Sequence, residues 1–286
     1  MDRFKLKLLM VLFMLLDSIR FFFNGAPFWF TYVGRVVMPI FFYLLVEGYF
    51  KTSSKSNYQK RLLLAAEIMF IGNLILSILV LKGVDGSNLM YNNFNLLSYG
   101  ITLLVLMFAV AILVVTFKTE ILTDKMASII IFLIICGGYA LRYAFYNKVY
   151  IMPNNMFLAL SAGFVMLNGL VQFRGKDFKS AFIKILVGTS LGIFTESLIL
   201  GPAFVFIFYK CFNNRRDMYL AIFVFSALFF PGFNLEALLK YPQWMMIFTI
   251  PFIFIYNGEK GKDFRWFFYI FYPLQLWILY LLSVLL

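Results

Sequence analysis

Long apolar runs separated by short polar connections follow one another along the chain, and they constrain the fold more than any other feature. A helix needs about 20 consecutive apolar residues to cross the roughly 30 Å of hydrocarbon in a bilayer. With 63% hydrophobic and 13% charged residues, the 286-residue chain has more apolar surface than one soluble core can hide. We therefore predict an all-α, polytopic integral membrane helix bundle. Its expected hydrophobic segments are 5–23, 28–50, 61–81, 96–117, 127–147, 153–172, 179–210, 218–238, 243–257 and 265–286.

Lysine and arginine in the short connections set the expected orientation of the bundle. These residues concentrate in loops on the cytoplasmic side of a membrane. They are frequent before the first apolar run and in the connections 51–61 and 118–125, whereas the connection 24–27 has none. We therefore expect a cytoplasmic N-terminus, a retained first span, a cytoplasmic connection at 259–265 and a C-terminus on the outer side. We also expect a single domain over residues 1–286, with about 10–11 hydrophobic helices.

The segment 179–210 is not expected to cross the membrane as one helix. Basic residues lie before and at its start, including Arg174 and Lys179, and after its end, including Arg215, so both of its ends should lie on the same side. We predict a break near residues 192–201, at Glu196, between two helices of about 14–15 residues that form a broken or re-entrant pair near 180–210. One long tilted helix that ends in a charged loop is the alternative.

The composition argues against several kinds of site. The chain has no histidine, and Cys136 and Cys211 stand apart, so we predict neither a metal site nor a disulfide framework. The net charge of +12 comes from basic flanks beside apolar runs, which predicts membrane lipids rather than nucleic acid as partners. The sequence has no glycine-rich phosphate-binding motif, so a nucleotide-binding fold is not indicated.

Charged side chains inside the first two apolar runs form the candidate site. A charge at the bilayer centre costs about 2.5–3.5 kcal/mol, so such residues usually face a cavity or a partner. Asp17, Arg20 and Asn24 share one helix face, and Ser18 lies beside them. We predict that this face lines a polar pocket that binds or orients a reacting group. For Arg20, extension to the membrane surface is the alternative.

The second apolar run carries Arg35 and Glu47, with Pro39 between them. Because proline has no backbone N–H, we expect a helix kink at Pro39, with Arg35 in the outer half and Glu47 near the cytoplasmic end. One interpretation places both charged residues at a catalytic centre around one cavity with Asp17. The other is a structural ion pair between Arg35 and Asp17 that ties the two helices together.

A basic loop with hydroxyl groups follows this run and contains Thr52, Tyr58 and Arg61. Arginine offers several planar donors to a phosphate, so these residues are candidates for binding the phosphates of a soluble acyl donor. Ordinary basic flanking of a membrane helix is the alternative explanation for the lysines of this loop. Other polar residues expected at membrane depth are Glu67, Asn73, Ser77, Arg142, Glu196 and Gln275.

Two stretches of the sequence resemble the TraX family of integral membrane proteins. The first is LLDSIRFFF followed by YVGRVVMPIFFYLLVEGYFKTSSKSNYQKRL, within residues 15–62, and it contains the pattern GR-x3-P-x7-EGY-x2-T. The second is YNGEKGKDFRWFFYIFYPLQLWILYLL, residues 256–282. Residues 81–251 match the family only by hydropathy. TraX proteins are known as acetylases of conjugative pilin and are similar to membrane acyltransferases that use cytoplasmic acyl-coenzyme A.

The resemblance implies a multi-pass acyltransferase of the bacterial plasma membrane. Acetyl-CoA or another acyl-CoA would be the donor, without a metal, and the acceptor would be a peptide, a pilin-like protein or a cell-envelope glycan. The implied residues are Asp17, Arg35 and Glu47 for catalysis, Ser18, Arg20, Tyr272 and Gln275 for the substrate, and Thr52, Tyr58 and Arg61 for the donor.

Both histidines of the family pattern are replaced. The pattern reads Asp-His and Tyr-Pro-x-His where this chain has Asp17-Ser18 and Tyr272-Pro273-Leu274-Gln275. A histidine base is worth about 10²–10⁴-fold in rate, and neither serine nor glutamine is a base at neutral pH. Either Asp17 or Glu47 acts as the base instead, or the protein is a non-catalytic homologue that binds a membrane partner or serves as a scaffold. A transporter is a third hypothesis.

Overall fold

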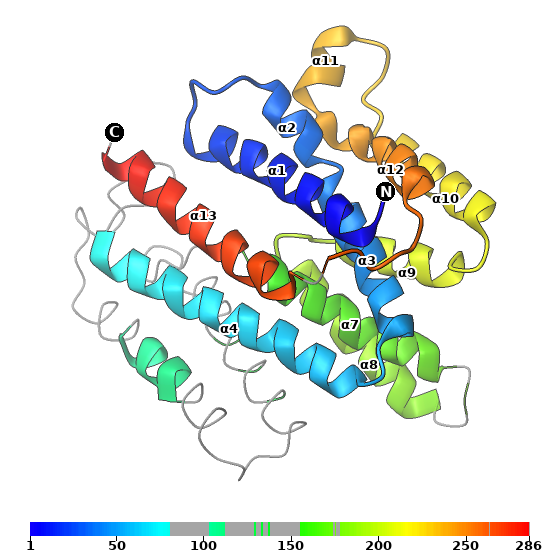
Figure 1. Ribbon diagram of the computed structural model, residues 1–286, viewed down its shortest axis with the longest axis horizontal. Coiled ribbons are helices and arrows are strands. Elements are labelled where there is room, and N and C mark those ends of the chain that lie inside the picture. Colours follow the sequence, from blue (N-terminus) through cyan, green and yellow to red (C-terminus); the bar gives the residue numbers. More distant parts are fainter. Residues whose placement is uncertain are drawn as a thin grey trace.

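Helices account for all the regular structure that the computed structural model describes, which agrees with the all-α prediction (Figure 1). The described residues are 1–80, 103–111, 129, 133, 137, 155–173, 175, 178–262 and 264–285. Most of the expected segments 96–117 and 127–147 lies outside them, as do Cys136, Arg142 and the side chain of Ser77. Residues 103–111 are helical.

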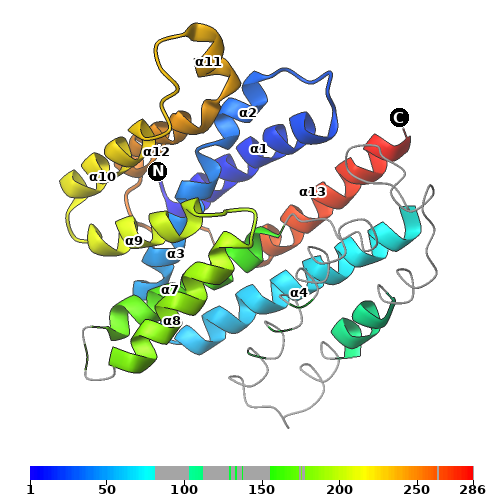
Figure 2. The same ribbon diagram turned by 180° about the vertical axis from the view of Figure 1, so that it is seen from behind.

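Three long helices lie side by side, with α13 in the middle. α1 (Arg3–Phe22) and α4 (Lys55–Val80) flank α13 (Arg265–Leu285) in both views (Figures 1 and 2). The Asp2 side chain caps α1 by accepting a hydrogen bond from the Lys5 N–H at 2.8 Å. At Gly72 the Trp277 ring lies where a Cβ would be, so glycine allows α4 and α13 to approach closely.

The second apolar run is divided into α2 (Trp29–Gly34) and α3 (Val37–Lys51). The interruption lies at Arg35 and Val36, earlier than the kink expected at Pro39. Pro39 has no N–H to donate to the Arg35 carbonyl, and the backbone N–H groups of Arg35 and Val36 instead bond three residues back, to Tyr32 and Val33. The proline therefore acts one helical turn before its own position.

The predicted break inside 179–210 is confirmed. α8 (Phe178–Ile193) and α9 (Leu200–Lys210) are separated by turns at 194–199, where Leu198 adopts a positive φ of 46°. α8 packs closely on α7 (Met156–Gln172), where Gly169 and Gly188 leave no room for a Cβ. The Tyr209 hydroxyl donates to the Leu170 carbonyl at 2.9 Å, so the end of α9 returns to the end of α7.

The expected segments 218–238 and 243–257 are both divided. α10 (Arg215–Ala227) ends eleven residues before the expected end at residue 238, and α11 (Leu235–Lys240) follows a turn at Gly232, whose φ of 100° suits glycine. A 3₁₀ helix, η1 (Pro242–Phe248), then leads into α12 (Thr249–Ile255). The expectation of one continuous helix in each segment is therefore wrong, because the prolines and glycine of these stretches interrupt the helical hydrogen bonds.

Two helical segments among the described residues are long and apolar enough to cross a membrane, Trp29–Lys51 and Trp266–Leu285. Large apolar side chains are exposed at every fourth residue of α13, at Trp266, Ile270, Leu274 and Ile278. Such an outward stripe suits contact with lipid or a partner protein. Together these features support a membrane protein, and the number of crossings stays a prediction.

Candidate functional site

Two cavities share part of their lining. The polar cavity, of about 590 Å³, contains the side chains of Asp17, Arg35 and Glu196 in its lining. The basic cavity, of about 480 Å³, is lined by cationic side chains from several segments. Met14 of α1, Met156 of α7 and Tyr272 of α13 line both. The two cavities are therefore neighbours along the same helices.

Asp17 and Arg35 face each other in the polar cavity. Arg35 Nη2 lies 3.5 Å from Asp17 Oδ1, and Arg35 Nε donates to the Thr31 carbonyl at 3.2 Å. A Cβ at Gly34 would overlap the Asp17 carboxyl group, so glycine lets α1 approach α2 here. The two interpretations of this pair are compatible, because the ion pair joins two elements and both side chains line the cavity.

The polar cavity also brings Ser18 and Arg20 to its wall. The Ser18 hydroxyl donates to the Met14 carbonyl at 2.8 Å, so this hydroxyl bonds to its own helix. Arg20 Nη1 donates to the carbonyls of Asn24 and Ala26, and its guanidinium lies 5.3 Å from the centre of the Phe28 ring. The loop after α1 therefore holds Arg20 at the edge of the cavity.

Tyr272 links the polar cavity to the break between α8 and α9. Its hydroxyl donates to Glu196 Oε1 at 3.1 Å and accepts the Met156 N–H at 3.3 Å. Glu196 was expected at the break but was not among the candidate site residues. Gln275, one turn after Tyr272 on α13, is 5% exposed, its amide has no partner among the described residues, and it lines neither cavity.

The basic cavity gathers cations that are distant in the sequence. Thr52, Tyr58 and Arg61, which were predicted as donor-binding residues, all line it. The Arg61 guanidinium lies 5.7 Å from the centre of the Tyr58 ring. None of the lining residues that the structure describes is acidic. The cations in its lining are Arg3, Lys7, Lys51, Arg61, Lys260 and Lys262. This wall suits a ligand with several negative charges.

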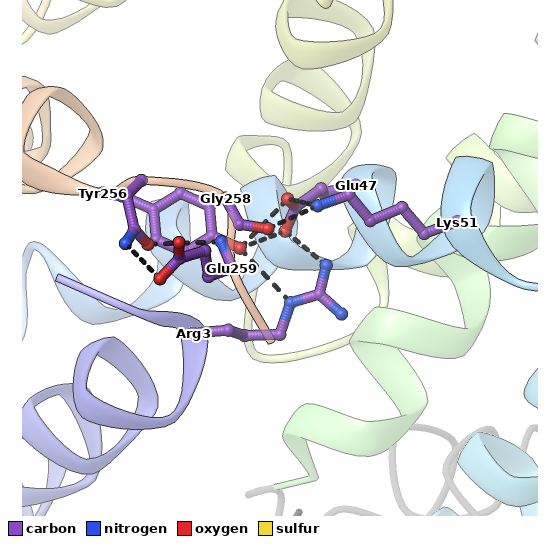
Figure 3. Close-up of polar contacts among 7 residues, drawn as sticks. Arg3, Glu47, Lys51, Tyr256, Gly258 and Glu259 are labelled. Carbon is purple, nitrogen blue, oxygen red and sulfur yellow. Dashed lines mark hydrogen bonds and ion pairs between the residues drawn. The ribbon is translucent and has the colours of Figure 1, made fainter. Parts of the chain in front are cut away.

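Glu47 lies outside the lining of both cavities and joins three segments (Figure 3). Its carboxylate accepts hydrogen bonds from Arg3 Nη2 at 2.6 Å, from Lys51 Nζ at 2.7 Å and from the Tyr256 hydroxyl at 2.8 and 3.0 Å. The expectation that Glu47 shares a cavity with Asp17 and Arg35 is therefore wrong. Twelve residues separate it from Arg35, which is about 18 Å along a helix axis.

The Glu47 network ties the N-terminus to the loop after α12. Lys51 Nζ also donates to the Gly258 carbonyl at 2.7 Å, and the terminal ammonium donates to the Ile255 carbonyl at 2.7 Å. Tyr256 lies in this loop, and burial raises the pKa of its phenol, which therefore stays protonated and donates to Glu47. Glu47 thus fixes two cations of the basic cavity, Arg3 and Lys51.

The other two residues of the EGY motif, Gly48 and Tyr49, pack beside the basic cavity. A Cβ at Gly48 would lie 3.0 Å from the Tyr58 hydroxyl oxygen, so glycine admits this ring beside α3. The Tyr49 hydroxyl donates to Asn168 Oδ1 of α7 at 2.9 Å. The described residues contain no group of three or more metal-ligating side chains that could hold an ion. Of the three motif residues, Gly48 lines the basic cavity, and Glu47 and Tyr49 hold neighbouring segments in place beside it.

The sequence alone did not identify several lining residues. Arg3 and Lys7 were interpreted only as orientation signals, and Lys260 and Lys262 were not singled out, yet all four line the basic cavity. The sequence contained one indication that these four residues could lie together, because the N-terminus and the loop before α13 were expected on the same side of the membrane. Glu196 carried a stronger signal, since it is an acidic residue at a predicted helix break.

Comparison with known proteins identifies the family. The model of the TraX protein family matches residues 2–152 and 106–283. No match was found among curated proteins or among solved structures. The two matched segments extend over nearly the whole chain and include both stretches that carry the resemblance, which confirms it. The chain therefore belongs to the TraX family.

Proposed function

We propose that this protein is a multi-pass acyltransferase of the bacterial plasma membrane. It would move an acetyl or other short acyl group from cytoplasmic acyl-CoA to a peptide amine or a glycan hydroxyl. The observation that carries this proposal is the pair of neighbouring cavities, one basic and one with paired charges, that share Met14, Met156 and Tyr272. A transferase with a charged donor needs a site for the donor's phosphates and a separate reaction centre within reach of it.

The basic cavity supplies the features that an acyl-CoA donor requires. Arg61 and Lys262 offer cationic donors for phosphates, and Thr52 and Tyr58 lie beside them. Leu44, Leu45 and Phe157 provide an apolar wall for the less polar arm of the donor. The volume of about 480 Å³ lies within the range of small-molecule sites. The donor's acyl end would then approach Tyr272.

The polar cavity supplies the reaction centre. An acceptor nitrogen or oxygen attacks the thioester carbonyl carbon, the carbon–sulfur bond breaks, and the thiolate of coenzyme A leaves. Negative charge develops on the carbonyl oxygen, where a positioned guanidinium such as Arg35 stabilises it. Asp17 orients that guanidinium through the 3.5 Å contact. The acceptor enters beside Ser18 and Arg20.

A non-catalytic TraX homologue is the second candidate, and the two replaced histidines favour it. Ser18 bonds to its own helix, and Gln275 is buried away from both cavities, so neither can take a proton from an acceptor. Such a homologue would bind a lipid, a peptide or a membrane partner through the same cavities. The transporter hypothesis is supported only by the break at 194–199 and by charges of the kind that line transport pathways.

The test uses the purified full chain in phospholipid vesicles with radiolabelled acetyl-CoA and a cell-envelope extract. The proposal predicts release of free coenzyme A together with label in a peptide or glycan of the extract. A calorimetric titration with coenzyme A is expected to show saturable binding. Absence of both binding and label transfer would favour the scaffold, and accumulation of solute inside the vesicles would favour the transporter.

A further inference from the structure

The break between α8 and α9 is stabilised by side chains on either side of Glu196. The Thr195 hydroxyl donates to the Gly192 carbonyl at 2.7 Å, and the Thr195 and Ser197 hydroxyls lie 2.9 Å apart. The Gly192 carbonyl also accepts the Thr195 N–H at 3.1 Å, so it keeps hydrogen-bond partners where α8 ends. Leu198, two residues after Glu196, holds a positive φ of 46°, which is uncommon for a side chain of this kind. The turns that carry Glu196 therefore contain a costly backbone conformation at Leu198.

Glu196 has a different environment from the other carboxylates near the site. Asp17 has Arg35 as a cationic partner, and Glu47 has Arg3 and Lys51. Among the described residues Glu196 has no cationic partner, and the hydrogen bond that it accepts comes from the neutral Tyr272 hydroxyl. It lines the polar cavity and remains exposed to it. Glu196 is thus the carboxylate of this cavity that is not neutralised by a fixed cation.

We propose that Glu196 is the catalytic base that takes the proton from the acyl acceptor in this chain. This inference rests on the proposed function and adds the residue that replaces the missing histidines. As the acceptor nitrogen or oxygen bonds to the thioester carbon, its proton moves to the Glu196 carboxylate. The carbon–sulfur bond breaks, and the thiolate receives that proton and leaves as the thiol of coenzyme A.

Tyr272 positions this base. Its hydroxyl is held by the Met156 N–H at 3.3 Å and donates to Oε1, which leaves Oε2 of Glu196 to face the acceptor. Because Tyr272 lines both cavities, the base lies next to the point where the donor's acyl group would arrive. Proximity of base, acceptor and thioester is the requirement for efficient proton transfer.

The experiment compares Glu196→Gln with a matched control, Glu67→Gln. Glu67 is a fully buried carboxylate on α4 that lines neither cavity and has no hydrogen-bond partner among the described residues. Each variant is assayed in vesicles with radiolabelled acetyl-CoA and the same cell-envelope extract, and coenzyme A binding is measured by calorimetry. We expect kcat to fall about 10²–10⁴-fold in Glu196→Gln, with unchanged coenzyme A affinity, and to change little in Glu67→Gln.

A rescue measurement separates a chemical role from a structural one. Glu196→Ala should regain part of its transfer rate when formate is added, because the small carboxylate can occupy the vacated space. If the wild type transfers label and the Glu196→Gln variant is equally active, the base assignment is wrong and the proposed function still stands. Loss of activity in Glu196→Gln together with loss of coenzyme A binding would also overturn it. If the wild type transfers no label, the proposed function fails and the base assignment fails with it.

Discussion

The two cavities share three side chains but differ in how their charges are balanced. In the polar cavity, carboxylates and guanidinium groups occur together, and Asp17 pairs with Arg35. In the basic cavity, the charged lining residues that the structure describes are all cations. Ion pairs fix the positions of the paired side chains, whereas an excess of positive or negative charge attracts a ligand of the opposite charge. The proposed function accordingly assigns the chemistry to the first cavity and the capture of an anionic donor to the second.

The cavities also arise from different parts of the helices. The polar cavity forms where helices are interrupted, at 35–36 and 194–199. The basic cavity forms where helices begin and end, from the N-terminus, the end of α3, the start of α4 and the loop before α13. Substitutions in the polar cavity should therefore change the rate of transfer, and those in the basic cavity should change donor affinity.

Among the substitutions that test the difference between the two cavities, the largest effect is expected for Arg35→Ala. Removing a donor that stabilises developing charge typically lowers kcat about 10²–10³-fold. Donor affinity should stay the same, because Arg35 does not line the basic cavity. Transfer of label at saturating acetyl-CoA and a calorimetric titration with coenzyme A provide the two measurements.

A double variant checks that Arg35→Ala does not act by leaving Asp17 unpaired. Arg35→Gln combined with Asp17→Asn removes both charges and preserves the shape of the contact. We expect this variant to insert into the membrane normally and to stay inactive. Recovery of wild-type transfer in the double variant would show that the Asp17–Arg35 pair only holds the two helices together and takes no part in the chemistry.

Glu47→Gln is expected to reduce stability rather than chemistry. Hydrogen bonds to a charged group contribute about 1.5–3 kcal/mol each, and Glu47 accepts them from Arg3, Lys51 and Tyr256. The free energy of unfolding should fall by about 2 kcal/mol, seen as a lower Tm in detergent. The exposed Glu236 of α11 provides the control, since Glu236→Gln should change Tm little.

The result for Glu47 also tests the separation of the two cavities. The folded fraction of Glu47→Gln should transfer label at a rate within a few-fold of the wild type at saturating donor. A Glu47→Gln protein with normal Tm and no transfer would make Glu47 a catalytic residue. The distinction between a reaction centre and a donor site would then be wrong.

A smaller effect is expected for Gly34→Ala, because its Cβ would overlap the Asp17 carboxyl group. Overpacking of this kind costs about 1–3 kcal/mol, and relief by movement of Asp17 would disturb its contact with Arg35. We expect transfer to fall about tenfold, which corresponds to about 1.4 kcal/mol. Gly25→Ala is the matched control, since a Cβ there meets nothing within 4 Å. Equal activities would show that the approach of α1 and α2 is not important.

The sequence predicted which residues line the polar cavity better than it predicted how the backbone forms that cavity. Periodicity placed Asp17 and Arg20 on one face, and the count of basic residues located the break at Glu196, because both follow from local spacing and charge. The sequence did not predict that Pro39 would interrupt the helix at Arg35, or that Gly34 would make room for Asp17. The position of the interruption depends on which backbone carbonyl loses its hydrogen-bond partner, and the room for Asp17 depends on how closely two helices approach.

The basic cavity was harder to predict for a different reason. Its cations come from chain segments as distant as Arg3 and Lys262, and no local pattern links them. Arg61 was identified because it lies in a short loop with Thr52 and Tyr58. Glu47 was wrongly expected to share a cavity with Asp17 and Arg35, because a charge in an apolar run has the same sequence signature whether it binds a substrate or pairs with an arginine.

The smallest effect is expected for Arg61→Ala, one cation among several in the basic cavity. Loss of one charged contact to a phosphate should weaken coenzyme A binding about five- to tenfold, or about 1–1.4 kcal/mol, and leave kcat at saturating acetyl-CoA unchanged. Raising the salt concentration should weaken wild-type binding in the same direction, because added ions screen charges at an open site. Arg216→Ala, which changes an exposed cation of α10 outside both cavities, should bind coenzyme A like the wild type. If Arg61→Ala and Arg216→Ala bind alike and salt has no effect, the basic cavity does not hold the donor's phosphates.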